Sequence, residues 1–389
     1  MPVALGQRAA GVVIAAALST VSVAAQSPAP TALRPPSAEL DEGFSRIGWV
    51  RELADGRLIV VDQFERRLVV VDFRTGAVRD IARAGQGPGE VRIIYGLVAL
   101  GGDSTLVEDR QARRWLIFDG ERAVATVISA PRAPVPALAG ADGRGRLLDI
   151  QGFAFRRSPG VPYTPMRVNA ESVLVLVRYR ERGGRGADPG APGRLASRID
   201  TIARLRGAGR GQTLVWRSAP PPASWWLLEN PLAAEEQALL FQDGWIALAF
   251  ADPYRVEWVT PEGSRVRAAP MAETPVAVDD RVRRALIAWR WPKVTPPFTS
   301  DQLPPWPATL PPFLNDALLA APDGRLVIRR TYNPFAPATS YDIVDRKGTL
   351  SGRLVLKANE RLVGFGARSA YVVAKDENDV EWLRRHPWP

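Results

Sequence analysis

The chain is built from short hydrophobic segments separated by turn residues. Residues 57–62 (RLIVVD) and 67–72 (RLVVVD) are two such segments, and weaker ones flank them at 47–53 and 77–82. Runs of this length, rich in β-branched residues and bounded by Asp-Gly or Thr-Gly, are typical of β-strands. Residues 47–82 therefore predict four antiparallel strands joined by tight turns.

This unit of four strands recurs along the rest of the chain. An Asp-Gly pair follows the first strand in four of the units, and glycine there supplies the positive φ that a tight hairpin requires. The last unit lacks its fourth strand. We expect the N-terminal segment near Thr31–Leu40 to supply that strand and to close the array into a ring, which leaves no open sheet edge. The further units span about residues 97–128, 136–205, 238–269, 317–356 and 361–384.

Four-stranded antiparallel units in series predict a β-propeller. The expected fold is all-β: a six-bladed β-propeller with an N-terminal strand closing the last blade and two lid-like insertions on one face. Residues 1–25 are then a signal peptide, 26–40 the N-terminal closing segment and 41–389 the propeller. The second lid begins with a helical pattern over residues 278–291. Insertions interrupt the repeat at about 152–171, 181–197, 207–235 and 276–312, of which the last two are the lids.

The first residues have the features of a secretory signal. Arg8 is the one charge, residues 9–21 are apolar, and the small residues 23–25 (VAA) permit cleavage before Gln26. The apolar run is shorter than the ~20 residues that a membrane-spanning helix needs, so a retained anchor is the weaker alternative. We therefore expect an exported protein, periplasmic or extracellular, with no transmembrane segment after cleavage.

Residues 83–90 (RAGQGPGE) resemble the GxGPGE segment that follows a blade in secreted bacterial six-bladed β-propellers of uncharacterised function. Residues 252–263 (DPYRVEWVTPEG) and 371–383 (YVVAKDENDVEWL) are similar to later segments of that group. The resemblance implies the fold and no particular activity, because the related TolB-like, NHL-like and gluconolactonase-like propellers perform different functions. Residues 83–90 themselves indicate a tight turn, or alternatively a cradle of backbone N–H groups for an anion.

The composition excludes several kinds of catalytic site. Cysteine is absent, and His386 is the single histidine. A Ser-His-Asp triad, a thiolate metal site and a multi-histidine metal site are therefore nearly excluded. The net charge of +10 is concentrated in residues 156–210, which hold twelve arginines. Such a charge is typical of nucleic-acid binding, but an exported protein meets little nucleic acid, so a solvated arginine-rich loop is the simpler interpretation.

Candidate ligand-binding residues lie on the face that carries the connections between blades and the loops between second and third strands. Tryptophans in the two insertions there suit stacking on sugars, peptides or cations, or else pack the insertions themselves. Arginines in neighbouring loops suit a carboxylate or phosphate, or are simply solvated. The candidates are Arg66, Arg67, Arg92, Arg113, Arg114, Trp225, Trp226 and Trp306.

These observations leave two main functions open. The favoured one is non-catalytic: an exported propeller that binds or scaffolds a protein partner, a sugar or an anionic ligand. The alternative is a calcium-dependent lactonase-like or esterase-like hydrolase or lyase, with Asn315 and Asp316 as metal ligands ahead of the fifth inner strand. No other cofactor is expected. A partner in an envelope complex, as for TolB-like propellers, is a third hypothesis.

Overall fold

The computed structural model describes residues 28–87, 89–128, 137–151, 171–180, 195–206, 212–216, 225–229, 232, 234, 236–290 and 306–388. Strands dominate this part of the chain, and it contains one helix, α1 (Asp280–Arg290), inside the predicted helical pattern. Within the same residues no helix has the length and apolar character needed to span a membrane. The expected signal peptide lies outside the described residues and stays a prediction.

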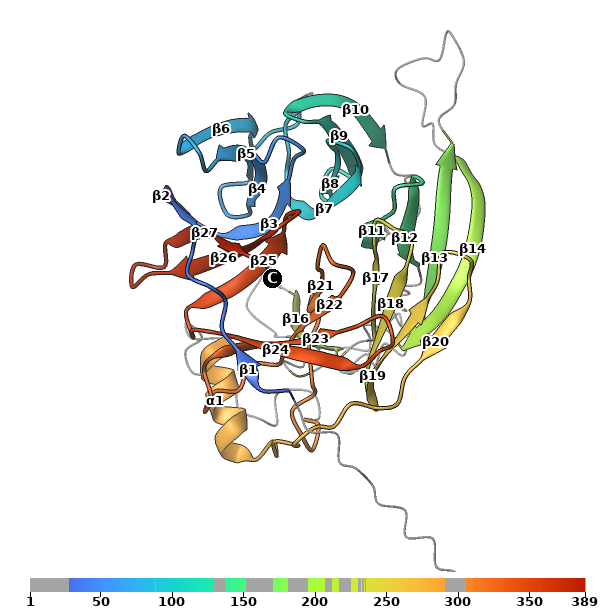
Figure 1. The fold of residues 1–389 in the computed structure, drawn as a ribbon, viewed down its shortest axis with the longest axis vertical. Helices are drawn as coiled ribbons and strands as arrows, with labels where there is room; N and C mark the ends of the chain where they lie inside the picture. The colour runs from blue at the N-terminus through green and yellow to red at the C-terminus, as the bar shows by residue number, and fades with distance from the viewer. Residues whose placement is uncertain are drawn as a thin grey trace, which may run out of the picture.

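Five blades each consist of four consecutive antiparallel strands, arranged around a centre (Figure 1). The first two blades contain β3 (Ile47–Glu52), β4 (Leu58–Asp62), β5 (Arg67–Asp72) and β6 (Ala77–Ala82), then β7 (Ile94–Gly101), β8 (Ser104–Asp109), β9 (Arg114–Asp119) and β10 (Arg122–Ile128). The third contains β11 (Ala137–Ala141), β12 (Arg146–Gln151), β13 (Glu171–Arg180) and β14 (Leu195–Arg206). The fourth and fifth contain β17 (Gln237–Leu240), β18 (Ile246–Ala251), β19 (Tyr254–Val259) and β20 (Arg265–Arg267), then β21 (Leu318–Ala320), β22 (Leu326–Arg329), β23 (Thr339–Val344) and β24 (Leu350–Leu356).

A composite sheet joins the two ends of the chain. Its outer strand, β2 (Ala38–Phe44), pairs antiparallel with β27 (Glu381–Pro387) and begins later than the expected Thr31–Leu40. Pro35 and Pro36 explain the shift, because proline has no N–H to contribute to a ladder. A short strand ahead of them, β1 (Pro30–Thr31), pairs instead with β24. The composite sheet contains β25 (Glu360–Phe365), β26 (Ser369–Lys375), β27 (Glu381–Pro387) and β2 (Ala38–Phe44).

The innermost strands follow one another around the ring. β3 contacts β7, β7 contacts β11, β11 contacts β17, β17 contacts β21, β21 contacts β25, and β25 contacts β3 again. A hairpin of β15 (Gln212–Trp216) and β16 (Trp225–Glu229) forms a separate two-stranded sheet. The fold is therefore an all-β propeller, as predicted, with five blades of consecutive strands beside the composite sheet.

The hydrophobic core lies between neighbouring blades. Successive residues of a strand point to opposite faces of the sheet. On β4, Val60 therefore packs towards Phe44 in one core cluster, while Ile59 and Val61 pack towards Phe118 in another. Because both faces are covered, all five residues of β4 are buried, and the four before Asp62 form a continuous apolar run.

The Asp-Gly turns form on the side of the ring that we call the turn face. In the first blade the Asp55 carboxylate accepts a hydrogen bond from the backbone N–H of Arg57 at 3.0 Å, and Gly56 has a φ of 84°. Gly244 and Gly324 have similar values of 89° and 83°. In the third blade the positive φ falls on Gly145 instead, because Arg144-Gly145 takes the position of Asp55-Gly56 in a turn with the same hydrogen bonds, and Asp142-Gly143 comes two residues earlier.

Candidate functional site

The opposite side, which we call the loop face, carries the connections between blades and the loops between second and third strands. The connection from β20 to β21 includes α1, whose first turn is capped by the Asp279 carboxylate, which accepts a hydrogen bond from the Val282 N–H at 2.8 Å. The described candidates from the sequence lie on or beside this face, so their partners decide what the face offers a ligand.

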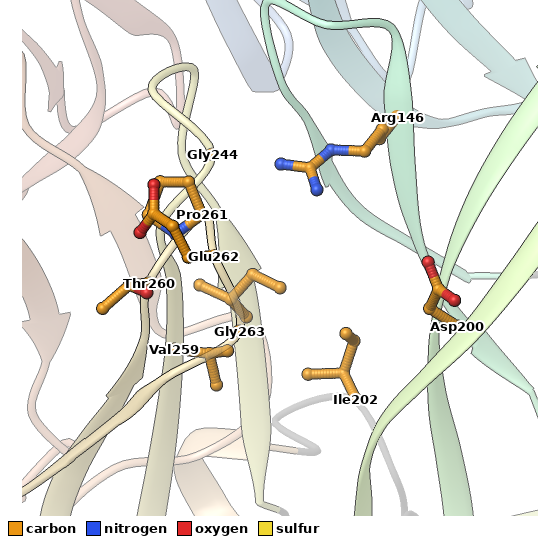
Figure 2. Close-up of a pocket in the computed structure, with 10 residues that line it drawn as sticks. Arg146, Asp200, Ile202, Gly244, Val259, Thr260, Pro261, Glu262 and Gly263 are labelled. Carbon is orange, nitrogen blue, oxygen red and sulfur yellow. The ribbon is translucent and has the colours of Figure 1, made fainter.

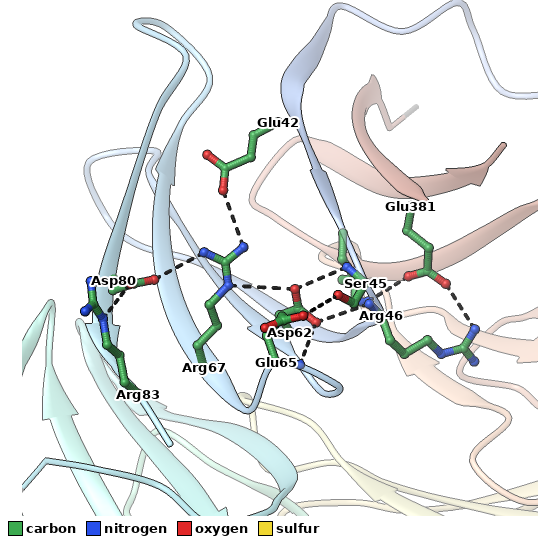
Figure 3. Close-up of polar contacts among 10 residues, drawn as sticks. Glu42, Ser45, Arg46, Asp62, Glu65, Arg67, Asp80, Arg83 and Glu381 are labelled. Atoms are coloured by element: carbon green, nitrogen blue, oxygen red, sulfur yellow. Dashed lines mark hydrogen bonds and ion pairs between the residues drawn. The ribbon is translucent and has the colours of Figure 1, made fainter. Parts of the chain in front are cut away.

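Arg67 belongs to a network around a buried carboxylate (Figure 3). Asp62, at the end of β4, is fully buried and accepts hydrogen bonds from the backbone N–H groups of Ser45 and Arg46, both at 3.2 Å. The Nε atom of Arg67 lies 3.8 Å from Asp62, and its Nη1 atom lies 3.4 Å from Asp80. This guanidinium therefore links the loop to the blade.

The second blade repeats the network. Asp109, buried at the end of β8, accepts hydrogen bonds from the backbone N–H groups of Arg92 at 3.1 Å and Ile93 at 3.2 Å. The Nε atom of Arg114 donates to Asp109 at 3.3 Å, and its Nη2 atom donates to the Glu90 carbonyl at 2.6 Å. Arg114 thus occupies the place that Arg67 has in the first blade, and Arg92 contributes its backbone.

Arg66 and Arg113 also occupy equivalent positions, each just before the third strand of its blade. Both are exposed, and both have a positive φ, 52° and 51°. This backbone conformation costs a non-glycine residue about 1 kcal/mol, so the loop geometry imposes it twice. The structure therefore distributes the arginine candidates over two separate loop networks rather than gathering them around one anion site.

The GQGPGE segment surrounds a carboxylate of its own. The side chain of Glu90 accepts a hydrogen bond from the Gly87 N–H at 2.6 Å, and the Gly85 N–H donates to the Val91 carbonyl at 2.9 Å. A Cβ at Gly85 would overlap the present position of the Glu90 carboxylate, so Glu90 would have to move. These contacts support the turn interpretation of this segment. The carboxylate that accepts the Gly87 N–H belongs to Glu90 and takes the place of an external anion.

Trp306 serves the packing of its own insertion. It lies half-buried against a cluster that includes Val278, Val282 and Leu286, which anchors α1 to the ring. Trp225 and Trp226 pair with Trp216 and Val215 in the β15–β16 hairpin, but their side chains lie outside the described residues. The role of the insertions as lids stays a prediction.

Exposed apolar side chains gather on the loop face of the first and second blades. Phe64, in the loop between β4 and β5, is 73% exposed. Ile93 and Tyr95, at the start of β7, are also exposed, and the guanidinium of Arg110 lies 4.3 Å from the centre of the Tyr95 ring. None of these four residues was among the sequence candidates.

A buried carboxylate holds Arg110 in place. Glu108, on β8, is 2% exposed and accepts a hydrogen bond from the Nε atom of Arg110 at 3.1 Å. Burial raises the pKa of Glu108, Arg110 opposes the shift, and the charge of Asp149 in the next blade adds to it. Arg110 is therefore fixed from below by Glu108 and covers the exposed ring of Tyr95.

A second exposed group involves α1 and the loop between β22 and β23. Trp289, at the end of α1, is 51% exposed and stacks on Tyr332, with ring centres 4.7 Å apart and planes at 18°. The guanidinium of Arg281 lies 4.1 Å from the centre of the exposed Phe335 ring. An exposed aromatic ring covered by an arginine thus occurs at two places on the loop face.

Asn315 and Asp316 lie on an exposed turn ahead of β21. Asp316 has a φ of 56°, and its backbone carbonyl accepts a hydrogen bond from Arg329 at 3.3 Å. Across the described part of the chain, no three histidine, aspartate or glutamate side chains are grouped so that they could hold a metal ion. Calcium binding stays a prediction from the sequence.

Among known proteins, the chain is distantly similar to several solved structures. No protein-family profile and no curated protein matches the chain. Similar solved structures include a catalytically inactive virginiamycin B lyase from Staphylococcus aureus with quinupristin (TM-score 0.42, 10% identity, 89% of this chain and 97% of that one). A calcium-binding regucalcin from Agrobacterium tumefaciens has a TM-score of 0.42 and 8% identity, over 92% and 97% of the chains. A DUF4221 family member from Bacteroides vulgatus has a TM-score of 0.45 and 8% identity, over 92% and 98%.

Proposed function

We propose that the protein is a non-catalytic binding propeller whose loop face takes an acidic segment of a partner protein. The observation that carries this proposal is the arginine held over an exposed aromatic ring at two places, Arg110 on Tyr95 and Arg281 on Phe335. A stacked guanidinium keeps N–H groups available at its edge for carboxylates, and the exposed ring offers apolar contact. Acidic side chains interspersed with aromatic ones complement both features.

The proposal also includes the finer architecture and the address expected from the sequence. We take the composite sheet as a sixth blade, which is supported by the contacts of β25 with β21 on one side and β3 on the other. Export to the periplasm or the exterior, with removal of residues 1–25, belongs to the same proposal. It rests on Arg8 and the apolar run that follows it.

A random copolymer of glutamate and tyrosine is a defined probe for the binding function. Biolayer interferometry with the immobilised protein should show binding that weakens as salt is raised, because exposed charges are screened. The double variant Tyr95→Ala/Phe335→Ala should weaken binding roughly tenfold or more. Val124→Ala removes an apolar side chain that is 51% exposed on the outer strand β10, and should leave binding unchanged.

Polygalacturonate, an acidic polysaccharide, is the comparison probe. Binding of polygalacturonate alone would replace the protein partner with a sugar. Equal binding of the glutamate–tyrosine copolymer by the double variant and by Val124→Ala would remove the loop face from the proposal. A copolymer that does not bind the unmodified protein would overturn the choice of partner.

A further inference from the structure

The seams between neighbouring blades differ in what covers them. The seam between the third and fourth blades contains a pocket of about 360 Å³, whose lining includes Arg146, Asp200 and Val259 (Figure 2). The seam between the fifth blade and the composite sheet is crossed by residues 30–37, which we call the strap (Figure 1). The strap begins with β1 on β24 and ends where β2 joins β27, so it connects the two sheets.

Few contacts hold the strap in place. Leu33 packs on a core cluster that contains Leu354 of β24 and Val372 of β26, so it covers apolar surface of both sheets. The Ser37 N–H donates a hydrogen bond to the Arg385 carbonyl at 2.7 Å. Three of the eight residues are prolines, which have no N–H group, and most of the strap is exposed. Such a segment should open at a lower free energy than the blades themselves.

His386 holds the middle of the strap. It lies near the end of β27, is 8% exposed, and is the single histidine of the chain. Its Nδ1 atom lies 2.8 Å from the Arg34 carbonyl oxygen, which can only accept, so Nδ1 carries the proton. Within the described residues, this is the one hydrogen bond that the strap makes between Thr31 and Ser37. The Nε2 atom is buried and has no hydrogen-bond partner in the same part of the structure.

The charged groups near His386 leave it without a counter-ion. Among the described residues, no carboxylate lies within 4.0 Å of it. Arg384, two residues earlier on the same face of β27, pairs with Glu39 of β2 and Glu360 of β25, both at 3.1 Å. The charged residues on the strap and on the strands and turns packed around His386 and the neighbouring Trp388 are Arg34, Glu39, Asp323, Arg325, Glu360, Arg368 and Arg384.

We propose that His386 makes the strap a pH-sensitive switch, closed while the imidazole is neutral and released when it is protonated. A proton on Nε2 adds a buried donor without an acceptor and a buried charge without a counter-ion, and both are unfavourable. A charged ring donates more strongly to the Arg34 carbonyl. Water replaces that bond in the open state, however, and does not reach Nε2 in the closed one.

The direction and size of the effect follow from proton linkage. An exposed histidine takes up its proton near pH 6.5. The open state therefore binds one proton more than the closed state below this pH. The equilibrium constant for opening should rise by up to about tenfold for each pH unit below 6.5. This switch does not rest on the function proposed for the loop face.

Hydrogen exchange of the full chain, followed by mass spectrometry between pH 5 and 8, tests the switch. The reporter is the Ser37 N–H, which is hydrogen-bonded in the closed strap. His386→Asn keeps a donor for the Arg34 carbonyl but does not titrate in this range. Both proteins have the same strap sequence, so the intrinsic pH dependence of exchange cancels in their ratio. Strap opening relative to the variant should rise about tenfold or more from pH 7.5 to 5. A constant or falling ratio would overturn the proposal.

Glu39→Gln is the matched control, because it removes a nearby titratable group and leaves His386 in place. It should keep the rise in strap opening at low pH. If His386→Asn does not fold, NMR of the unmodified protein supplies the second measurement, since a single histidine gives signals that need no assignment. The titration of this imidazole and the opening of the strap should have the same midpoint. Different midpoints, or loss of the pH dependence in Glu39→Gln, would assign the opening to another group and overturn the proposal.

Discussion

The loops between second and third strands differ between the first two blades and the fifth. In the first two blades the loop has four residues, 63–66 and 110–113, and is fixed by a buried aspartate at the end of the second strand. In the fifth blade the loop runs over nine residues, 330–338, and begins with Arg330 at the position equivalent to Asp62. The Asp342 carboxylate on β23 accepts a hydrogen bond from Arg330 at 3.2 Å, so in this blade the base follows the second strand and the acid lies on the third, two residues beyond the position of Arg67.

This comparison separates side chains that build the fold from those available to a partner. Features that repeat between the first two blades are used in folding: the buried aspartate, the arginine bound to it and the residue with positive φ. The exposed apolar and stacked groups lie at positions where the blades differ. Phe64 corresponds to Gln111, Arg110 corresponds to Gln63, and Phe335 lies in the enlarged loop of the fifth blade.

The strongest challenge to the comparison is removal of a repeated aspartate. Asp109→Ala deletes an acceptor of backbone N–H groups and leaves the mostly buried Arg114 without its carboxylate partner. The free energy of unfolding should fall by about 3–5 kcal/mol, as for other broken buried ion pairs. Urea denaturation measures this loss, and Asp119→Ala, at an exposed position of β9, is the matched control. Equal stability of the two variants would show that the repeated network is dispensable.

In the network of the fifth blade, each hydrogen bond should contribute less to the free energy of unfolding, because the Asp342 carboxylate has several partners. Asp342 accepts hydrogen bonds from the Tyr254 hydroxyl and the Arg353 Nε atom, both at 2.8 Å, as well as from Arg330. Asp342→Asn keeps one acceptor and removes the charge, so unfolding should become easier by about 2 kcal/mol. Urea denaturation at neutral pH checks this value. A loss as large as that of Asp109→Ala would make the two blades equivalent.

A smaller effect of opposite sign is expected where the loop geometry imposes positive φ. Arg66→Gly and Arg113→Gly should each raise the free energy of unfolding by up to about 1 kcal/mol, because glycine adopts this conformation without steric cost. Arg74→Gly alters an exposed arginine of the turn face whose own φ is not positive, and should not stabilise. If both loop variants are less stable, the contacts of these arginine side chains contribute more to the free energy of unfolding than the positive φ costs.

The buried Glu108 should contribute to the pH dependence of the free energy of unfolding. Its pKa is raised above the ordinary value of 4.5 in the folded protein, mainly by burial. The unfolded chain therefore loses this proton first, and the contribution of Glu108 to the free energy of unfolding falls as pH rises from 4.5 to its folded pKa. Glu108→Gln should remove this part of the pH dependence. A pH profile identical in both proteins would contradict the shift.

The smallest expected effect concerns calcium. On the proposed binding function, neither EDTA nor millimolar calcium should change the midpoint of thermal unfolding of the full chain. A ligand that binds the native state must raise its stability by mass action. A calcium-dependent rise that EDTA reverses, and that Asp316→Ala abolishes, would favour the hydrolase alternative instead.

The sequence by itself determined the all-β propeller, the strands of its blades, most of the turn conformations and the use of an N-terminal strand beside the last unit. These depend on local physics: apolar segments of strand length, glycine where φ is positive, and an incomplete final unit. The start of β2 at Ala38 also follows locally from Pro35 and Pro36.

Only the tertiary structure decided which charged and aromatic side chains are free for a partner. Arg67 and Arg110 both lie at loops between second and third strands, but Arg67 lies between two carboxylates, whereas Arg110 covers the exposed ring of Tyr95. Trp306 packs inside its insertion, while Tyr95 and Phe335 are exposed. The reason is physical: the pairing and burial of a side chain depend on neighbours brought together by ring closure, often from another blade, and local sequence carries no record of them.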